Sequence, residues 1–156
     1  MHLYVLVKEN GHWSNGSSEV MVRRLCDLIE FKDKLVYLDG KPAFIDSNYD
    51  LSVSHSDKLM VIAIAQQAIG IDLEKNKDLK PELIDRLKLS DSNPLTDWCL
   101  REAVIKLYND KTYLYKEVPE NTDHRIIDVF DGYTCVIASP QKIPDIKIIH
   151  LNENAL

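Results

Sequence analysis

The sequence is poor in cysteine, and the few cysteines that it has are not arranged as a binding or cross-linking motif. Cys26, Cys99 and Cys135 are odd in number and have no CxxC spacing, which argues against both a disulfide framework and a zinc site. We therefore expect each of them to be a small buried apolar residue in a reducing compartment.

Basic clusters and long hydrophobic runs are also missing. The 19 Lys and Arg against 25 Asp and Glu give a formal net charge of −6, whereas nucleic-acid binding requires a basic face. No apolar run approaches the roughly 20 residues of a membrane span. The first ten residues, "MHLYVLVKEN", lack the basic region of a secretory signal. These absences predict a cytoplasmic protein that uses neither nucleic acid nor a membrane as a partner.

The 156 residues, 45% of them hydrophobic, suit one domain with a sizeable core. Hydrophobic periodicity and turn residues predict a strand at 3–8, a helix that is capped by Ser17 or Ser18 and runs to about Phe31, and two strands within 35–45. The apolar side of that helix should consist of Val20, Val22, Leu25, Leu28 and Ile29. Two long strands should flank a polar break at 54–58.

The second half is predicted to contain two helices, at 82–88 and about 96–109, followed by antiparallel strands at 126–130, 133–138 and 146–151. Strands and helices recur in loosely the same order in both halves. The sequence therefore predicts an α+β chain, 1–156, with an N-terminal lobe at about 1–67 and a C-terminal lobe at about 68–156.

The segment "IGIDLEK", residues 69–75, places two carboxylates in an apolar strand. Asp72 and Glu74 are two positions apart, so their side chains lie on the same face, roughly 7 Å apart. Such a pair beside Ile69, Ile71 and Leu73 is costly to bury unless a cation compensates it, and a hard divalent metal is the first candidate. The alternative is a strand edge whose acidic side chains face water.

The segment "TDWCLREAVIKLYND" places an aromatic ring, a carboxylate and an ammonium group on one side of a helix. Trp98, Glu102 and Lys106 follow at i, i+4 and i+8. Taken alone, Glu102 and Lys106 could simply form a solvated ion pair. Together with Asp72 and Glu74, however, Glu102 would give Mg²⁺ a third carboxylate and leave room for water and a substrate phosphate.

Two further segments offer phosphate-binding groups. "SVSHSDK" contains Ser54, His55 and Ser56, whose hydroxyl and imidazole groups are suited to a phosphate or diphosphate oxygen. No G-x-S-x-G motif surrounds these serines, which disfavours a serine hydrolase. "DGKPAF" contains Lys41 next to a turn. The alternatives are an ordinary loop histidine and an ordinary turn.

Four of these segments occur in an order that resembles the 4′-phosphopantetheinyl transferases of the surfactin type. They are "GKP" at 40–42, "DLSVSHS" at 50–56, "IGIDLEK" at 69–75 and "WCLREAVIK" at 98–106. The resemblance covers about residues 35–110 and extends more loosely to "DGYTCVIAS" at 131–139. It implies a compact version of that fold, with two pseudo-repeated α+β lobes and antiparallel sheets.

The resemblance implies a Mg²⁺-dependent enzyme with coenzyme A as co-substrate. Members of this family transfer the 4′-phosphopantetheine arm of coenzyme A to a serine of an acyl or peptidyl carrier protein and release adenosine 3′,5′-bisphosphate. The metal ligands implied here are Asp72, Glu74 and Glu102. Glu102 is also the implied base for the carrier serine, and Lys106 would neutralise or protonate the departing phosphate.

The implied coenzyme A contacts come from several segments. Lys41, Ser54 and His55 would bind coenzyme A, and His55 would meet its 3′-phosphate. Arg101 stands where the family commonly has lysine; it keeps the positive charge but cannot shuttle a proton near neutral pH. The N-terminal region of the family supplies basic residues to the nucleotide, and here these would be Arg23 and Arg24. The alternative is that both are solvated charges on the exterior of the helix.

Two other functions are compatible with the same residues. One is a coenzyme A or carrier-protein binding module in which catalysis is impaired. The other, more remote, is a Mg²⁺-dependent phosphohydrolase that uses the same carboxylates. Three converging carboxylates favour the enzyme over the binding module, and the "SHS" and "GKP" segments favour coenzyme A over a generic phosphate ester.

Overall fold

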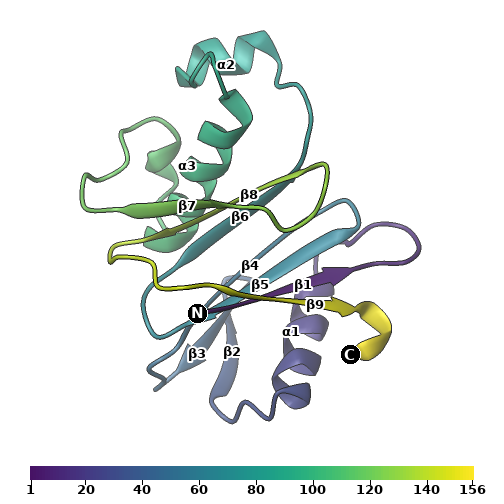
Figure 1. Cartoon of the computed structure of the whole chain (residues 1–156). Helices are drawn as coiled ribbons and strands as arrows, with labels where there is room; N and C mark the ends of the chain where they lie inside the picture. Colours follow the sequence, from purple (N-terminus) through teal and green to yellow (C-terminus); the bar gives the residue numbers. More distant parts are fainter. The chain divides into compact units, whose positions relative to one another are not determined.

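A computed structural model describes residues 1–156 of the chain, which form a mixed α+β structure with several antiparallel strand pairs (Figure 1). The chain divides into two compact units. The first consists of Met1–Ala68 together with Pro144–Leu156, and the second is Ile69–Ile143. The α+β class is therefore confirmed. One boundary between the units lies beside residue 68, and residues 144–156 belong to the first unit.

The first unit is built on a four-stranded sheet in the order β4-β5-β1-β9. Neighbours are antiparallel except β1 and β9, which run parallel, with His2 opposite Lys147. The strand predicted at 146–151 is present as β9, but the prediction that it pairs antiparallel was wrong, because it joins the edge of β1 in parallel. The elements of this unit are β1 (His2–Val7), α1 (Ser17–Leu28), β2 (Lys34–Leu38), β3 (Lys41–Ile45), β4 (Asp50–Ser56), β5 (Leu59–Ala65), β9 (Lys147–Asn152) and the 3₁₀ turn η2 (Glu153–Ala155).

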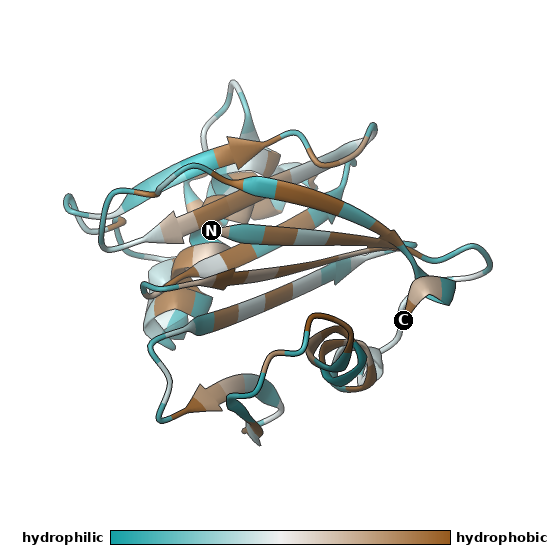
Figure 2. Cartoon of the chain, turned by 60° about the horizontal axis from the view of Figure 1, so that its bottom comes forward, coloured by the Kyte–Doolittle hydropathy of each residue, from teal (hydrophilic) through white to brown (hydrophobic).

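Helix α1 packs its apolar side on one face of this sheet (Figures 1 and 2). Val22, Leu25 and Cys26 of α1 share a buried cluster with residues of β1, β4 and β5. Two residues of the predicted apolar side do not take part, since Val20 and Leu28 are exposed. The predicted serine cap was also wrong. The helix is preceded by Gly16 in a left-handed conformation, with φ of 93° and no side-chain cap, a conformation that glycine adopts readily.

The turns of two hairpins in the first unit can be compared with the turns that the sequence predicts. The "DG" turn joins β2 to β3, and both Asp39 and Gly40 have positive φ, as a two-residue hairpin turn of the type I′ requires. The polar break predicted at 54–58 is shorter than expected. Strand β4 continues through Ser56, where Ser56 lies opposite Leu59, so "SHS" belongs to a strand and not to a turn.

The second unit carries a three-stranded antiparallel sheet in the order β6-β8-β7. Both of its α-helices begin with proline, and the Asn93 side chain caps α3 by accepting a hydrogen bond from the Thr96 amide. The predicted helix positions are therefore confirmed within two residues. The elements are β6 (Gly70–Lys75), α2 (Pro81–Leu87), α3 (Pro94–Tyr108), the 3₁₀ turn η1 (Lys111–Leu114), β7 (Asp123–Ile127) and β8 (Tyr133–Ser139).

The strands of the two units follow the same order. In the first unit, β1 pairs antiparallel with β5, which pairs antiparallel with β4. In the second unit, β6 pairs with β8 and β8 with β7 in the same sense. In each unit the first strand precedes the longest helix, and this helix packs on that strand and its neighbour. The two units thus share one topology, to which the first adds β9 and the β2–β3 hairpin.

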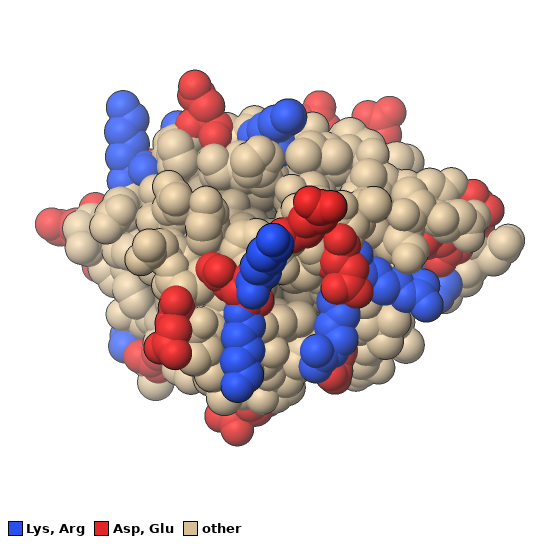
Figure 3. Space-filling model, turned by 90° about the horizontal axis from the view of Figure 1, so that it is seen from below, with Lys and Arg blue, Asp and Glu red and all other residues tan.

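One face of the molecule shows no separation of charge. On the face drawn in Figure 3, lysine and arginine side chains are interspersed with aspartate and glutamate. This distribution accords with the modest net charge of −6. None of the helices combines the length and the apolar character needed to cross a membrane.

The three thiols should resist alkylation in the native protein. Cys26, Cys99 and Cys135 are free and buried, and burial raises the pKa of all three thiols, that of Cys135 to about 12. Since the thiolate is the reactive form, iodoacetamide at neutral pH should add no label to the native chain and one label per cysteine after denaturation, as read by mass spectrometry. Rapid native labelling of Cys99 would show that α3 does not stay packed on the sheet.

Candidate functional site

A close approach of α3 to β6 creates the candidate site of the second unit. Gly70, the first residue of β6, lies against the α3 backbone, and a Cβ built on it would be 1.9 Å from the Ala103 carbonyl oxygen and 2.7 Å from the Leu107 amide nitrogen. Only glycine permits this contact. Because alternate residues of a strand share a face, Asp72 and Glu74 lie on the same side of β6 as Gly70 and therefore also meet α3.

Asp72 is held by a lysine from the helix. It is 5% exposed, and its Oδ1 accepts a hydrogen bond from Lys106 Nζ at 3.0 Å. The same ammonium group donates to the Ile71 carbonyl oxygen at 2.9 Å. A buried carboxylate is costly without a partner of opposite charge, so Lys106 compensates Asp72 and ties the helix to the strand.

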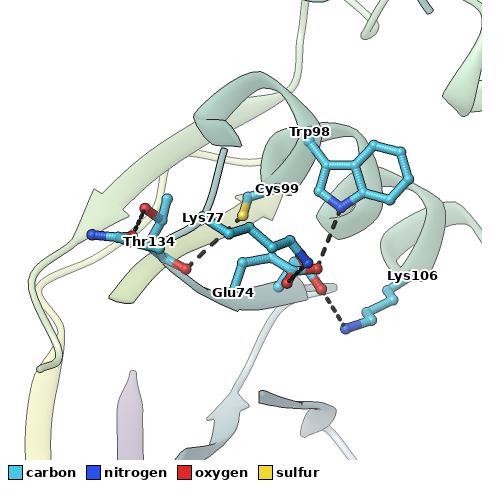
Figure 4. Close-up of polar contacts among 8 residues, drawn as sticks. Glu74, Lys77, Trp98, Cys99, Lys106 and Thr134 are labelled. Carbon is cyan, nitrogen blue, oxygen red and sulfur yellow. Dashed lines mark hydrogen bonds and ion pairs between the residues drawn. The ribbon is translucent and has the colours of Figure 1, made fainter. Parts of the chain in front are cut away.

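Each carboxylate oxygen of Glu74 accepts one hydrogen bond (Figure 4). Trp98 Nε1 of α3 donates to Oε1 at 3.3 Å, and Lys77 Nζ donates to Oε2 at 2.9 Å. Figure 4 shows Trp98 and Lys106 projecting from α3 towards the strand carboxylates, and Cys99 directed to Thr134 of β8. The helix thus supplies contacts to both strand carboxylates, through Trp98 at one end and Lys106 at the other.

Glu102 lies between these contacts on α3 and has a raised pKa. The main cause is burial, and the negative charges of Asp72 and Glu74 add to it, while Lys106 opposes it. A carboxylate whose pKa is raised is a stronger base than an ordinary carboxylate, which suits a general base. The interaction with Asp72 and Glu74 also shows that the three carboxylates share one electrostatic environment.

The donor atoms of these carboxylates can be compared with those that magnesium sites use. Asp72, Glu74 and Glu102 supply oxygen ligands, which Mg²⁺ prefers, and their mutual repulsion would be relieved by a divalent cation. As the side chains stand, no three acidic, histidine or cysteine groups form a cluster that would hold a metal ion. The strand carboxylates are turned to Lys106 and Lys77 instead. The donor set therefore fits Mg²⁺, provided that these ion pairs rearrange.

Arg101 takes part in a different set of contacts. Its guanidinium donates to the carbonyl oxygens of Leu87, Lys88 and Leu114 at 2.6–3.1 Å and to Asp97 at 3.3 Å. These bonds fasten the end of α2 and the end of η1 to α3. A coenzyme A phosphate at Arg101, which the resemblance implies, would have to replace them.

The other predicted coenzyme A contacts lie in the first unit. Lys41 is exposed at the start of β3, and Ser54 and His55 are neighbours on β4. Because they are successive residues of a strand, Ser54 and His55 point to opposite faces. Ser54 is 7% exposed, whereas His55 is half-buried on the face that packs against α1, opposite Met60. The sequence prediction that both groups project from one turn was wrong.

Arg23 and Arg24 are exposed on α1 of the first unit. Arg23 pairs with Glu19 at 3.3 Å and lies 5.6 Å from the centre of the Tyr37 ring. An exposed pair of this kind contributes little stability, so Arg23 could exchange Glu19 for a phosphate at low cost.

Sequence reasoning missed three features of the second-unit site. It did not identify Gly70 as the point of close approach, the hydrogen bond of Trp98 to Glu74, or the ion pair of Lys77 with Glu74. A glycine that opens an otherwise regular strand was the available signal for the first. The i, i+4, i+8 spacing had placed Trp98 on the right side of the helix. No local pattern distinguishes Lys77 from the other lysines near it.

No protein-family model matches the chain, and no curated protein sequence matches it.

Proposed function

We propose that the chain is a compact 4′-phosphopantetheinyl transferase of the surfactin type. It would transfer the phosphopantetheine arm of coenzyme A to a serine of an acyl or peptidyl carrier protein and release adenosine 3′,5′-bisphosphate. The resemblance of four ordered segments motivates the proposal. The observation that carries it is the meeting of Asp72, Glu74, Glu102 and Lys106 on facing surfaces of β6 and α3.

The topology supports the finer fold assignment within this proposal. A fold with two pseudo-repeated α+β lobes requires the same strand order in both, and the orders β4-β5-β1 and β7-β8-β6 satisfy this requirement. The two repeated units differ in the side chains that their first strands present to the helix. The face of β1 that meets α1 presents Tyr4 and Leu6, whereas the face of β6 that meets α3 presents Asp72 and Glu74. We therefore place the reaction in the second unit.

The reaction joins the carrier serine oxygen to the phosphorus that bears the pantetheine arm and breaks the bond from that phosphorus to the bridging diphosphate oxygen. Asp72, Glu74 and Glu102 would hold Mg²⁺, which neutralises diphosphate charge when bound. Glu102 would accept the proton of the serine hydroxyl. Lys106 orients Asp72 and places a positive charge beside the departing bisphosphate.

Residues of the first unit complete the proposal. Lys41, Ser54 and His55, with Arg23 and Arg24, would contribute to coenzyme A binding.

A cytoplasmic location belongs to the same proposal, since the three cysteines are free thiols, as is usual in a reducing compartment.

Incubation of the protein with coenzyme A, Mg²⁺ and a panel of apo carrier proteins tests this function. The carrier should gain the mass of one phosphopantetheinyl group, and the gain should depend on Mg²⁺ and on the carrier serine. A serine-to-alanine carrier is the control. If no carrier of the acyl or peptidyl type gains mass, the transferase proposal is wrong.

One observation favours a binding module as the second candidate. Both strand carboxylates already have lysine partners, Lys106 for Asp72 and Lys77 for Glu74, and this pairing stabilises the metal-free state. A binding module would retain coenzyme A or a carrier without modifying it. Binding in the absence of Mg²⁺, without any gain of carrier mass in its presence, would identify this second function.

The His55→Ala variant should bind coenzyme A less well through loss of the 3′-phosphate contact. We expect the apparent KM for coenzyme A to rise roughly ten- to 150-fold, the equivalent of a charge-assisted hydrogen bond of about 1.5–3 kcal/mol. Dephospho-coenzyme A lacks the 3′-phosphate, so its KM should change little. Equal increases with both substrates would place the 3′-phosphate elsewhere.

A further inference from the structure

We propose that Lys77 acts as the counter-ion of Glu74. Its ammonium group pairs with Glu74 when no divalent cation is bound and moves away from Glu74 when one binds. The inference rests on the proposed function, because it concerns the carboxylates of the proposed magnesium site. It adds a residue, Lys77, that neither the four motifs nor the proposed reaction uses.

The contacts of Glu74 show the competition directly. Lys77 Nζ lies 2.9 Å from Oε2 and Trp98 Nε1 lies 3.3 Å from Oε1, so both carboxylate oxygens already accept a hydrogen bond. A metal ion would bind the same two oxygens, each of which keeps a further lone pair. A metal ion on Glu74 would repel the neighbouring Lys77 ammonium group. Lys77 and the metal ion therefore compete for Glu74 through charge repulsion.

Of the two lysines, Lys77 is the one whose ammonium group can move away from its carboxylate partner. The Lys77 side chain is 54% exposed, whereas that of Lys106 is 26% exposed. Lys106 is also anchored by the Ile71 carbonyl oxygen as well as by Asp72. Lys77 instead borders an open polar groove of about 540 Å³ that is also lined by Asn76, Asn93, Thr96 and Thr134. Its ammonium group can thus leave Glu74 and remain solvated.

Calorimetric titration of MgCl₂ into the protein, without coenzyme A or carrier, tests the proposal. We expect the Lys77→Gln variant to bind Mg²⁺ about two- to fivefold more tightly than the wild type, because a partly exposed ion pair no longer has to be broken. Lys80→Gln is the matched control. It removes the same charge from an exposed residue three positions further along the chain, and it should bind Mg²⁺ as the wild type does.

A conservative variant separates charge from side-chain shape. Lys77→Arg keeps the positive charge beside Glu74 and should bind Mg²⁺ close to the wild-type affinity. If Lys77→Gln binds Mg²⁺ with wild-type or lower affinity, the counter-ion role is overturned while the proposed magnesium site stands. If neither the wild type nor any variant binds Mg²⁺, both the counter-ion role and the magnesium site of the proposed function are overturned.

Discussion

The Glu102→Gln variant is expected to transfer phosphopantetheinyl groups about 10²- to 10⁴-fold more slowly than the wild type, as measured by kcat with a saturating carrier protein. The amide cannot accept the proton of the carrier serine, and a positioned general base contributes a factor of this size. The exposed residue Glu120 provides a matched control, because Glu120→Gln makes the same chemical change away from the site. Full activity of Glu102→Gln would exclude Glu102 as the base.

The same variant should be more stable than the wild type near pH 7. Burial and the charges of Asp72 and Glu74 raise the pKa of Glu102, so its ionised form disfavours the folded state. As the pH falls through this raised pKa, the folded protein takes up a proton before the unfolded chain does, and the wild type gains stability. Denaturant unfolding should therefore show a difference at pH 7 that shrinks as the pH falls towards 4.5, the ordinary pKa of this carboxyl group. A variant that is less stable at both pH values would show that Glu102 supports the fold.

Gly70→Ala is expected to destabilise the second unit by about 3 kcal/mol or more. The added Cβ would lie 1.9 Å from the Ala103 carbonyl oxygen, and this atom belongs to the helix backbone, so it can move only if α3 itself moves. Such a shift would also carry Glu102 and Lys106 away from β6. Activity should therefore fall with stability, and chemical denaturation measures the latter.

Gly132→Ala is the matched control for this prediction. Gly132 lies in the same unit and a Cβ there would meet nothing within 4 Å, but its φ of +81° disfavours other residues. Its replacement should cost only about 1–2 kcal/mol, the penalty of a left-handed conformation. If Gly70→Ala unfolds like the wild type, then α3 does not depend on close contact with β6.

Local sequence signals predicted the local structure well. Pro81 and Pro94 marked the starts of α2 and α3 within two residues, because proline fits the first turn of a helix. The "DG" pair marked the β2–β3 turn because Asp39 and Gly40 both adopt positive φ. The parallel pairing of β9 with β1 was not predictable in this way, since it joins opposite ends of the chain and has no local pattern.

For the candidate site, too, the sequence predicted the local arrangement of side chains but not the tertiary contact. The spacing of Asp72 and Glu74 fixes their common face in any strand, and that of Glu102 and Lys106 fixes theirs in any helix. Which strand face meets which helix face depends on the tertiary contact at Gly70. For the same reason the sequence suggested a metal as the partner of the carboxylates, while the structure gives them Lys77 and Lys106.

The pairing of β9 with β1 has a consequence for the order of events during synthesis. A ribosome releases β1 before β5, and β5 before the continuous stretch Ile69–Ile143 that forms the second unit. The second unit can therefore fold while the sheet of the first unit still lacks β9. During that interval the edge of β1 presents unpaired backbone groups to other nascent chains, so this edge exposes the chain to aggregation until β9 emerges.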